Sequence, residues 1–180
     1  MSRLITASAA VLALWSTIVL AEPPATKPMP GPEHQRLGYF VGNWRSEGTI
    51  NPNPFMPAGG FSSDDRCTWF EGGFAVVCNS TGSSPMGPTV SLGIMGYSTE
   101  EKVYTYLGAE NSPMAMTSVP RGSVKDGAWV YEDQSKMGGK LVKFRYLINE
   151  SSPTSYSFKW EMLGDDGRWQ TVVEGKSMKK

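Results

Sequence analysis

The sequence is poor in the residues from which many catalytic and metal sites are built. Among 180 residues there is one histidine, His34, and there are two cysteines, Cys67 and Cys78. A single histidine excludes a metal site made of several histidines and leaves no catalytic relay around a second histidine base. The sequence therefore predicts a protein that is not an enzyme. Catalysis would need a site assembled from separate strands.

The chain also lacks an excess of charge of either sign, with 17 basic and 17 acidic residues. Proteins bind nucleic acids largely by neutralising phosphates with Lys and Arg, so this balance argues against nucleic acid as a partner. It likewise gives no reason to expect an anionic membrane surface as a partner. Nothing in the sequence indicates an oligomeric state.

A long hydrophobic run occurs only at the start of the sequence. Residues 1–21 contain Arg3, an apolar stretch and small residues at their end, which is the pattern of a cleaved signal peptide. The alternative is an uncleaved membrane anchor, since residues 4–21 approach the length that spans a bilayer. Cleavage is favoured, which predicts a secreted or periplasmic protein without a stable membrane anchor. A flexible Pro-rich leader at 22–31 and a single domain at 32–180 would follow.

Helical periodicity is scarce as well. Only residues 32–41 show apolar residues at helical spacing, with Pro32 at the favoured first position and Gly42 at the end. His34 lies in the first turn of this helix and is expected to be exposed.

The sequence is rich in segments that alternate between apolar and polar residues, joined by turns of Gly, Pro, Asn and Asp. The strand candidates are 43–50, 61–70, 74–81, 89–97, 102–109, 114–124, 128–134, 140–148, 154–163 and 168–178. Hairpin-connected strands form a meander, and closing it removes the exposed edges. The sequence therefore predicts an all-β protein, an antiparallel up-and-down barrel of about ten strands with a short N-terminal helix.

Turn chemistry also predicts two registers. A two-residue turn at Gly72-Gly73 sets Cys67 opposite Cys78, close enough for a disulfide, and export would supply the oxidising compartment. The alternative is two free buried thiols.

The second register concerns the last two strands. A four-residue loop at 164–167 would pair Met162 with Trp169 and would turn Glu161 to solvent.

Acidic residues occur in four adjacent pairs, which are Asp64-Asp65, Glu100-Glu101, Glu132-Asp133 and Asp165-Asp166. Neighbouring residues of a strand point to opposite faces, so no pair forms a local acid/base site. Solvated charges are expected, and pairing between distant strands cannot be read from the sequence.

Two methionines are candidate ligands for a soft metal ion. Met114 and Met116 share a face of a candidate strand, and thioethers suit Cu(I). Filling of a core or pocket is favoured over copper because no Cys or His lies nearby. Neither a cofactor nor a metal site is expected.

Aromatic residues are the one feature that points to a function, because barrels of eight or more strands can hold a small ligand. The candidate ligand-binding residues are Trp69, Tyr104, Phe144, Tyr146, Tyr156, Phe158, Trp160 and Arg145. The rings would contact a small, largely apolar ligand, and Arg145 or Arg66 would reach an anionic head group. The alternative is a structural or interaction module of the cell envelope, with a core that the rings fill.

Three segments carry a resemblance to a known family: QRLGYFVGNWRSEG at 35–48, FEGGFAVV at 70–77 and GYSTEEKVYTY at 96–106. The first is similar to the opening of calycin-type barrels (lipocalins, fatty-acid-binding proteins and nitrobindins), in which the Trp, here Trp44, closes one barrel end. Together the segments resemble a bacterial calycin- or lipocalin-like family catalogued as a domain of unknown function (DUF1579).

The similarity covers about residues 33–178. It implies a lipocalin-like barrel and at most small-molecule binding, and it carries no settled catalytic residues. Nitrobindin-like barrels bind haem through a histidine near the C-terminus, which this sequence lacks, so haem is not expected.

Overall fold

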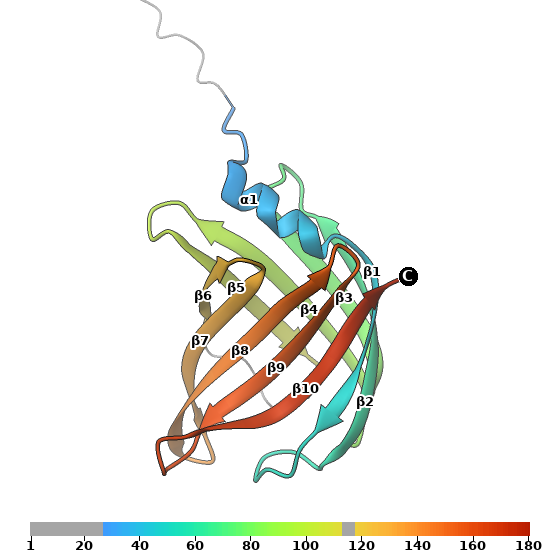
Figure 1. Ribbon diagram of the computed structural model, residues 1–180, viewed down its shortest axis with the longest axis vertical. Coiled ribbons are helices and arrows are strands. Elements are labelled where there is room, and N and C mark those ends of the chain that lie inside the picture. Colours follow the sequence, from blue (N-terminus) through green and yellow to red (C-terminus); the bar gives the residue numbers. More distant parts are fainter. Residues whose placement is uncertain (1–26, 113–117) are drawn as a thin grey trace, which may run out of the picture.

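The computed structural model describes residues 27–112 and 118–180 and shows a closed antiparallel β-barrel preceded by a short helix (Figure 1). The predicted signal peptide, residues 22–26 of the predicted leader, and the pair Met114 and Met116 lie outside the described residues. In the part of the chain that is described, no helix combines the length and apolarity needed to span a membrane.

Ten strands form the barrel wall, each paired with the next in the chain, and β1 also pairs with β10 to close the ring. Their bounds are β1 Gly42–Ile50, β2 Gly59–Trp69, β3 Ala75–Ser84, β4 Gly87–Ser98, β5 Val103–Glu110, β6 Arg121–Lys125, β7 Ala128–Met137, β8 Lys140–Ser152, β9 Ser155–Leu163 and β10 Trp169–Lys179. The predicted fold class is confirmed. β6 is shorter than the strand predicted at 114–124, and it pairs with β5 only at Tyr104 and Thr105.

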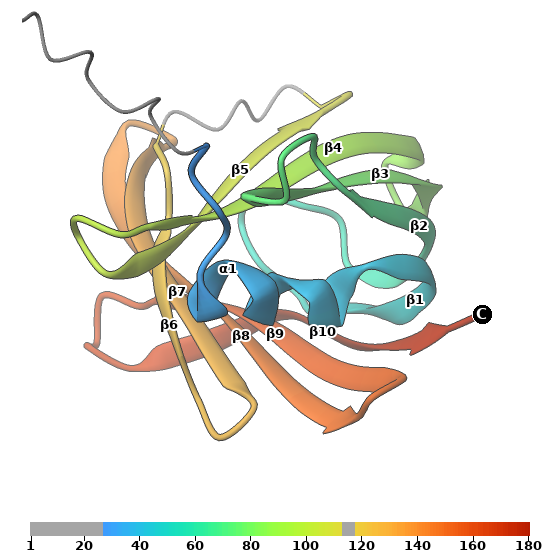
Figure 2. The same ribbon diagram turned by 90° about the horizontal axis from the view of Figure 1, so that it is seen from above.

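The predicted helix consists of α1, Pro32–Arg36, and a 3₁₀ turn, η1, Leu37–Phe40. It lies across one end of the barrel (Figures 1 and 2). Leu37 and Phe40 are buried there, as the apolar spacing of the sequence requires.

The predicted exposure of His34 is wrong, because its side chain is only 6% exposed. The ring lies edge-on against Phe74 and Tyr97, with centroids 5.1 and 5.5 Å away, and Nδ1 accepts a hydrogen bond from the Gly31 N–H. His34 therefore belongs to the contact between the helix and the barrel.

The hairpin between β2 and β3 has the predicted register but a longer loop. Residues 71–74 form a four-residue loop, closed by a hydrogen bond from the Phe70 N–H to the Ala75 carbonyl. The two glycines of the loop have φ of +91° and +77°, which other residues rarely adopt. The loop is longer by one residue on each side, so Cys67 still faces Cys78, and the predicted disulfide is present.

The predicted register between β9 and β10 is wrong. The connecting loop spans five residues, 164–168, so Trp169 pairs with Leu163 rather than with Met162 and lies on the outer face. A bulge between Thr171 and Val173 then shifts the register by one further residue, so Val173 pairs with Trp160 and lies on the inner face.

Glu161, which was expected to face solvent, is instead buried on the outer face of the barrel. Its carboxylate accepts hydrogen bonds from Arg145 Nε at 2.6 Å and from the Thr171 hydroxyl at 3.2 Å. These partners cover the charge.

Candidate functional site

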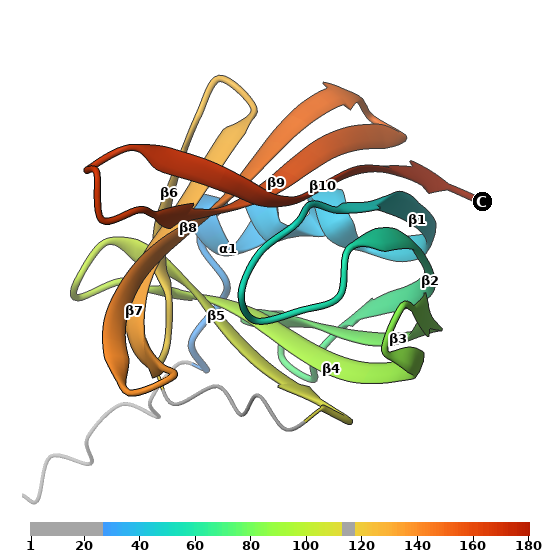
Figure 3. The same ribbon diagram turned by 90° about the horizontal axis from the view of Figure 1, so that it is seen from below.

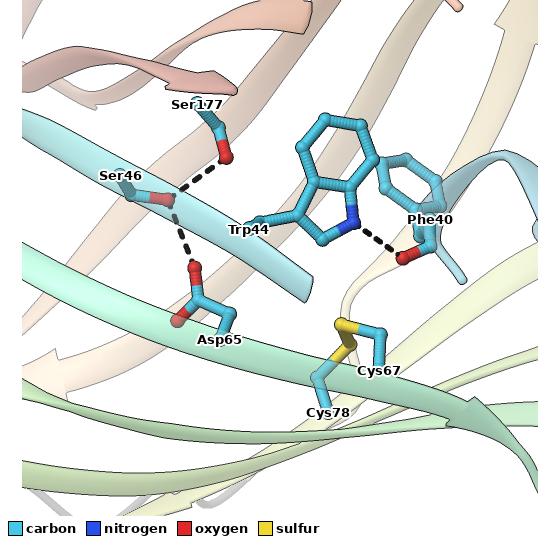
Figure 4. Close-up of a disulfide and its surroundings, with 7 residues drawn as sticks. All are labelled: Phe40, Trp44, Ser46, Asp65, Cys67, Cys78 and Ser177. Carbon is cyan, nitrogen blue, oxygen red and sulfur yellow. Dashed lines mark hydrogen bonds between the residues drawn. A yellow bond between two sulfur atoms is a disulfide. The ribbon is translucent and has the colours of Figure 1, made fainter. Parts of the chain in front are cut away.

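The end of the barrel beneath the helix, which we call the packed end, is filled by side chains. Trp44 is 1% exposed and Trp129 is completely buried. The indole N–H of Trp44 donates to the Phe40 carbonyl at 2.7 Å (Figure 4). The indole N–H of Trp129 donates to Glu150 at 2.6 Å, and Glu150 also forms an ion pair with Arg36 of α1. Trp44 thus lies under the helix, at the end where the family resemblance places it.

Towards the other end, the inward-facing side chains surround the barrel axis, which Figure 3 views from below. We call this set the chamber. Strand register places in it Ser46, Phe61, Asp65, Tyr106, Glu110, Tyr131, Asp133, Phe144, Tyr146, Tyr156, Phe158, Trp160 and Ser177.

The chamber contains open space next to Tyr146. This residue faces Tyr131 on β7 and Trp160 on β9, so its ring points inward, yet 36% of its surface is exposed. Tyr146 lies in the middle of β8, far from either strand end, so we attribute this exposure to space inside the barrel. At the packed end, Trp44, Tyr104 and Trp129 are at most 6% exposed, and the more exposed Trp69 is the last residue of β2.

Aromatic rings also lie closer together at the packed end than in the chamber. At the packed end, ring centroids of Trp129 lie 4.8 Å from Tyr104 and 5.1 Å from Phe40. In the chamber, Phe144 and Trp160 are 6.2 Å apart, near the outer limit for aromatic contact.

Glycines explain where the chamber rings lie. A Cβ at Gly122 would be 2.5 Å from the ring of Tyr131, its partner across the ladder, and a Cβ at Gly48 would be 2.7 Å from the ring of Phe61. The same holds for Gly175, whose Cβ would be 2.6 Å from Phe158. These rings lie over bare backbone, along the wall of the barrel.

A polar network crosses the chamber wall between β1, β2 and β10 (Figure 4). The Ser46 hydroxyl donates to Asp65 Oδ2 at 2.9 Å and lies 3.0 Å from the Ser177 hydroxyl. The Tyr156 hydroxyl lies next to these two serines. The network holds the Asp65 carboxylate on the inner face.

Tyrosine hydroxyls in the chamber stay protonated at neutral pH. Burial raises the pKa of Tyr156 to about 12, and the Asp65 carboxylate adds to the rise. Burial raises the pKa of Tyr146 well above its usual value, with smaller contributions from Tyr156, Tyr106 and Asp65. The pKa of Tyr131 is raised by the same cause. These groups therefore act as hydrogen-bond donors rather than as bases.

Five of the eight predicted ligand-binding residues lie together in the chamber, namely Phe144, Tyr146, Tyr156, Phe158 and Trp160. Tyr104 lies at the packed end, buried against Trp129. Trp69 lies at the same end, where its ring contacts Gly38 of η1.

Arg145 does not face the interior. The alternation that turns Phe144 and Tyr146 inward turns Arg145 outward, where it forms an ion pair with Glu161 and stacks over Trp169 at 4.3 Å. The expectation that Arg145 reaches a head group inside the barrel is therefore wrong. Arg66 is also exposed on the outer face of β2.

The polar residues of the chamber were not predicted from the sequence. Asp65 shares a face with Cys67, and Asp133 shares one with Trp129, so the alternation already contained the signal. The assignment of Asp65 as a solvated charge is wrong, because it faces the interior.

An open groove also crosses the outer wall over Gly48 and Gly175. Its charged side chains pair with one another, Arg45 with Glu47 and Lys159 with Glu174. In the described chain, no three His, Cys, Asp or Glu side chains are grouped so that they could hold a metal ion.

Comparison with known proteins supports the fold. A model of the family described as "Protein of unknown function (DUF1579)" matches residues 29–179. The crystal structure of Rv2717c from M. tuberculosis has a TM-score of 0.57 at 12% identity, covering 84% of this chain and 99% of that chain. The S-type phycobiliprotein lyase CPES from Guillardia theta has a TM-score of 0.51 at 16% identity, covering 82% of this chain and 92% of that chain. Among the curated proteins no match was found. At these identities the likeness concerns the fold alone.

Proposed function

The chain belongs to the DUF1579 family of proteins of unknown function, and on that premise we propose that it is an exported, non-catalytic protein that binds a small ligand in the chamber. The ligand has a largely apolar body, which the rings of Phe144, Tyr146 and Trp160 contact. Tyrosine and serine hydroxyls supply the hydrogen bonds that orient it.

One observation carries the proposal: Tyr146 points inward and is nevertheless 36% exposed. A filled core would bury this ring as completely as Trp129 is buried. The raised pKa values of Tyr146 and Tyr156 suit these hydroxyls to donate hydrogen bonds to a ligand rather than to act as bases.

Export is supported by the apolar segment at residues 1–21 and by the Cys67–Cys78 disulfide, since disulfides persist in oxidising compartments. Cell fractionation and intact mass of the native protein test this part. We expect a chain that begins at Glu22 and has no alkylatable thiol. A cytoplasmic, full-length chain contradicts it.

Native mass spectrometry of protein purified gently from its source tests the binding function, because it needs no guess about the ligand. We expect a bound small molecule, or uptake of the neutral dye Nile red by ligand-free protein. Tyr146→Ala should weaken dye binding, whereas Leu141→Ala, on an exposed side chain at the end of β8, should not. Ligand-free protein that takes up no dye favours the alternative, a structural or interaction module.

A further inference from the structure

Among the described residues that make up the chamber, the charged side chains are all acidic. They are Asp65 on β2, Glu110 on β5 and Asp133 on β7. Asp65, Ser80, Ser91 and Glu110 are successive partners across four strands, so they form one inward row.

No basic side chain neutralises these carboxylates. Within residues 27–112 and 118–180, none of the three takes part in an ion pair. Asp65 accepts from the neutral hydroxyl of Ser46, and Glu110 accepts from that of Ser112. Hydroxyl donors hold the carboxylates in place but leave their charge uncompensated.

The basic groups nearest to the interior are already engaged. Lys179 faces inward at the packed end, where its ammonium lies 4.9 Å from the Trp44 ring. Lys140 and Arg168 lie at the hairpin ends of the opposite side, and they pair with Asp165 and Asp166.

A second, independent observation points to a ligand in the same place. The Tyr131 side chain is 3% exposed, and its hydroxyl has no hydrogen-bond partner. Asp133, the next inward residue of β7, has a buried Oδ2 atom that also lacks a partner. Buried polar groups without partners are rare in native proteins, and a bound molecule would satisfy these two.

The chamber walls are suited to a positive charge as well. The electron-rich faces of Tyr and Trp attract cations, more strongly where water is excluded. Tyr106, Tyr146 and Trp160 face the same interior as the three carboxylates. Burial raises the pKa of Tyr106 and Tyr146, and the charge of Asp65 adds a smaller part of the rise.

We infer that the chamber binds a small organic cation, an amine or quaternary ammonium on an apolar body, and that the carboxylates of Asp65 and Asp133 balance its positive charge. This inference rests on the proposed function and deepens it by naming the ligand's charge. It excludes the anionic ligand for which Arg145 was considered.

Three probes with one naphthalene ring and different charge test the inference by calorimetric titration of the mature protein at neutral pH. They are 1-naphthylmethylammonium, 1-naphthalenemethanol and 1-naphthoate. We expect the cation to bind at least about tenfold more tightly than the neutral alcohol, because one partly desolvated ion pair contributes that much. The anion should bind most weakly.

Isosteric variants test which carboxylates are responsible for the preference for the cation. Asp65→Asn still accepts from Ser46 but lacks the charge, so it should weaken the cation at least about fivefold and leave the alcohol within about twofold. Asp133→Asn should act in the same direction. The matched control is Asp64→Asn, whose carboxylate lies on the outer face and pairs with Arg45 and Lys180. It should change none of the three affinities.

The outcomes separate the two proposals. If none of the probes binds, the binding function fails, and this inference fails with it. If the alcohol or the anion binds as tightly as the cation, the function stands and the cation is ruled out. Unchanged cation affinity in both Asp65→Asn and Asp133→Asn overturns the inference. Should Asp65→Asn not fold, Asp133→Asn decides alone.

Discussion

The packed end and the chamber are built from the same strands, with the same alternation and many of the same residue types, yet only one of them is filled. At the packed end, η1 inserts Leu37 and Phe40 between the inward-facing rings. In the chamber no helix enters, and glycines such as Gly122 let Tyr131 lie against the wall. In this barrel, the aromatic rings fill the interior where neighbouring side chains hold them near the axis, and they lie against the wall where glycines leave room for them.

The largest change in stability is expected when a tryptophan is removed from one half of the barrel or the other. Trp129→Ala removes a completely buried ring and the donor to Glu150, so it should lower the free energy of unfolding by about 3–5 kcal/mol. Trp160→Ala should cost less, because its ring borders open space. Urea unfolding followed by circular dichroism measures both. Equal losses would mean that the chamber is packed as tightly as the other end.

A smaller loss is expected at the chamber wall. In Gly122→Ala the new Cβ would lie 2.5 Å from the Tyr131 ring and 2.8 Å from the Val130 carbonyl oxygen, and such overpacking costs about 1–3 kcal/mol. The control is Gly60→Ala on β2, where the nearest atom is 3.9 Å away. Equal stability of the two variants in urea would show that the Tyr131 ring is free to leave the wall.

Alkaline titration tests the low polarity of the chamber. An unfolded tyrosine has a pKa of about 10, and that of native Tyr156 is about 12. Above pH 10 the unfolded chain therefore loses protons that the native chain keeps, so stability falls as the pH rises and is constant below. Each such tyrosine contributes up to about 1.4 kcal/mol per pH unit. Urea unfolding at several alkaline pH values measures the slope, which Tyr156→Phe should reduce. Tyrosinate absorbance that saturates near pH 10 in native protein would contradict this.

The smallest effect is expected for Tyr131→Phe. It removes a buried hydroxyl without a partner, so stability should stay within about 1 kcal/mol of the parent or rise. At the packed end, the Tyr39 hydroxyl lies 2.9 and 2.8 Å from the carbonyl oxygens of Ser152 and Ser155, and Tyr39→Phe should cost about 1 kcal/mol. A clear loss for Tyr131→Phe in urea unfolding would reveal a bonding partner in the ligand-free protein.

Local patterns in the sequence determined the wall of the barrel. Alternation at a period of two assigns each residue to a face, so the strands and the inward set from Phe144 to Trp160 could be predicted. The Gly-Gly pair indicates a turn between two strands, so the pairing of Cys67 with Cys78 could be predicted as well. The rule of alternation, applied from Cys67, would also have placed Asp65 inside, although the sequence alone led us to expect a solvated charge. These features depend on neighbours along the chain.

Only the tertiary structure decided what each face meets. His34 is buried because the helix presses it between Phe74 and Tyr97, and Trp169 faces outward because one extra loop residue shifts its register. Asp65 on β2 and Asp133 on β7 face one interior only because the sheet closes on itself. Alternation states whether a side chain points inward. Which side chains meet across the axis depends on contacts between distant strands. Those contacts distinguish the packed end from the chamber.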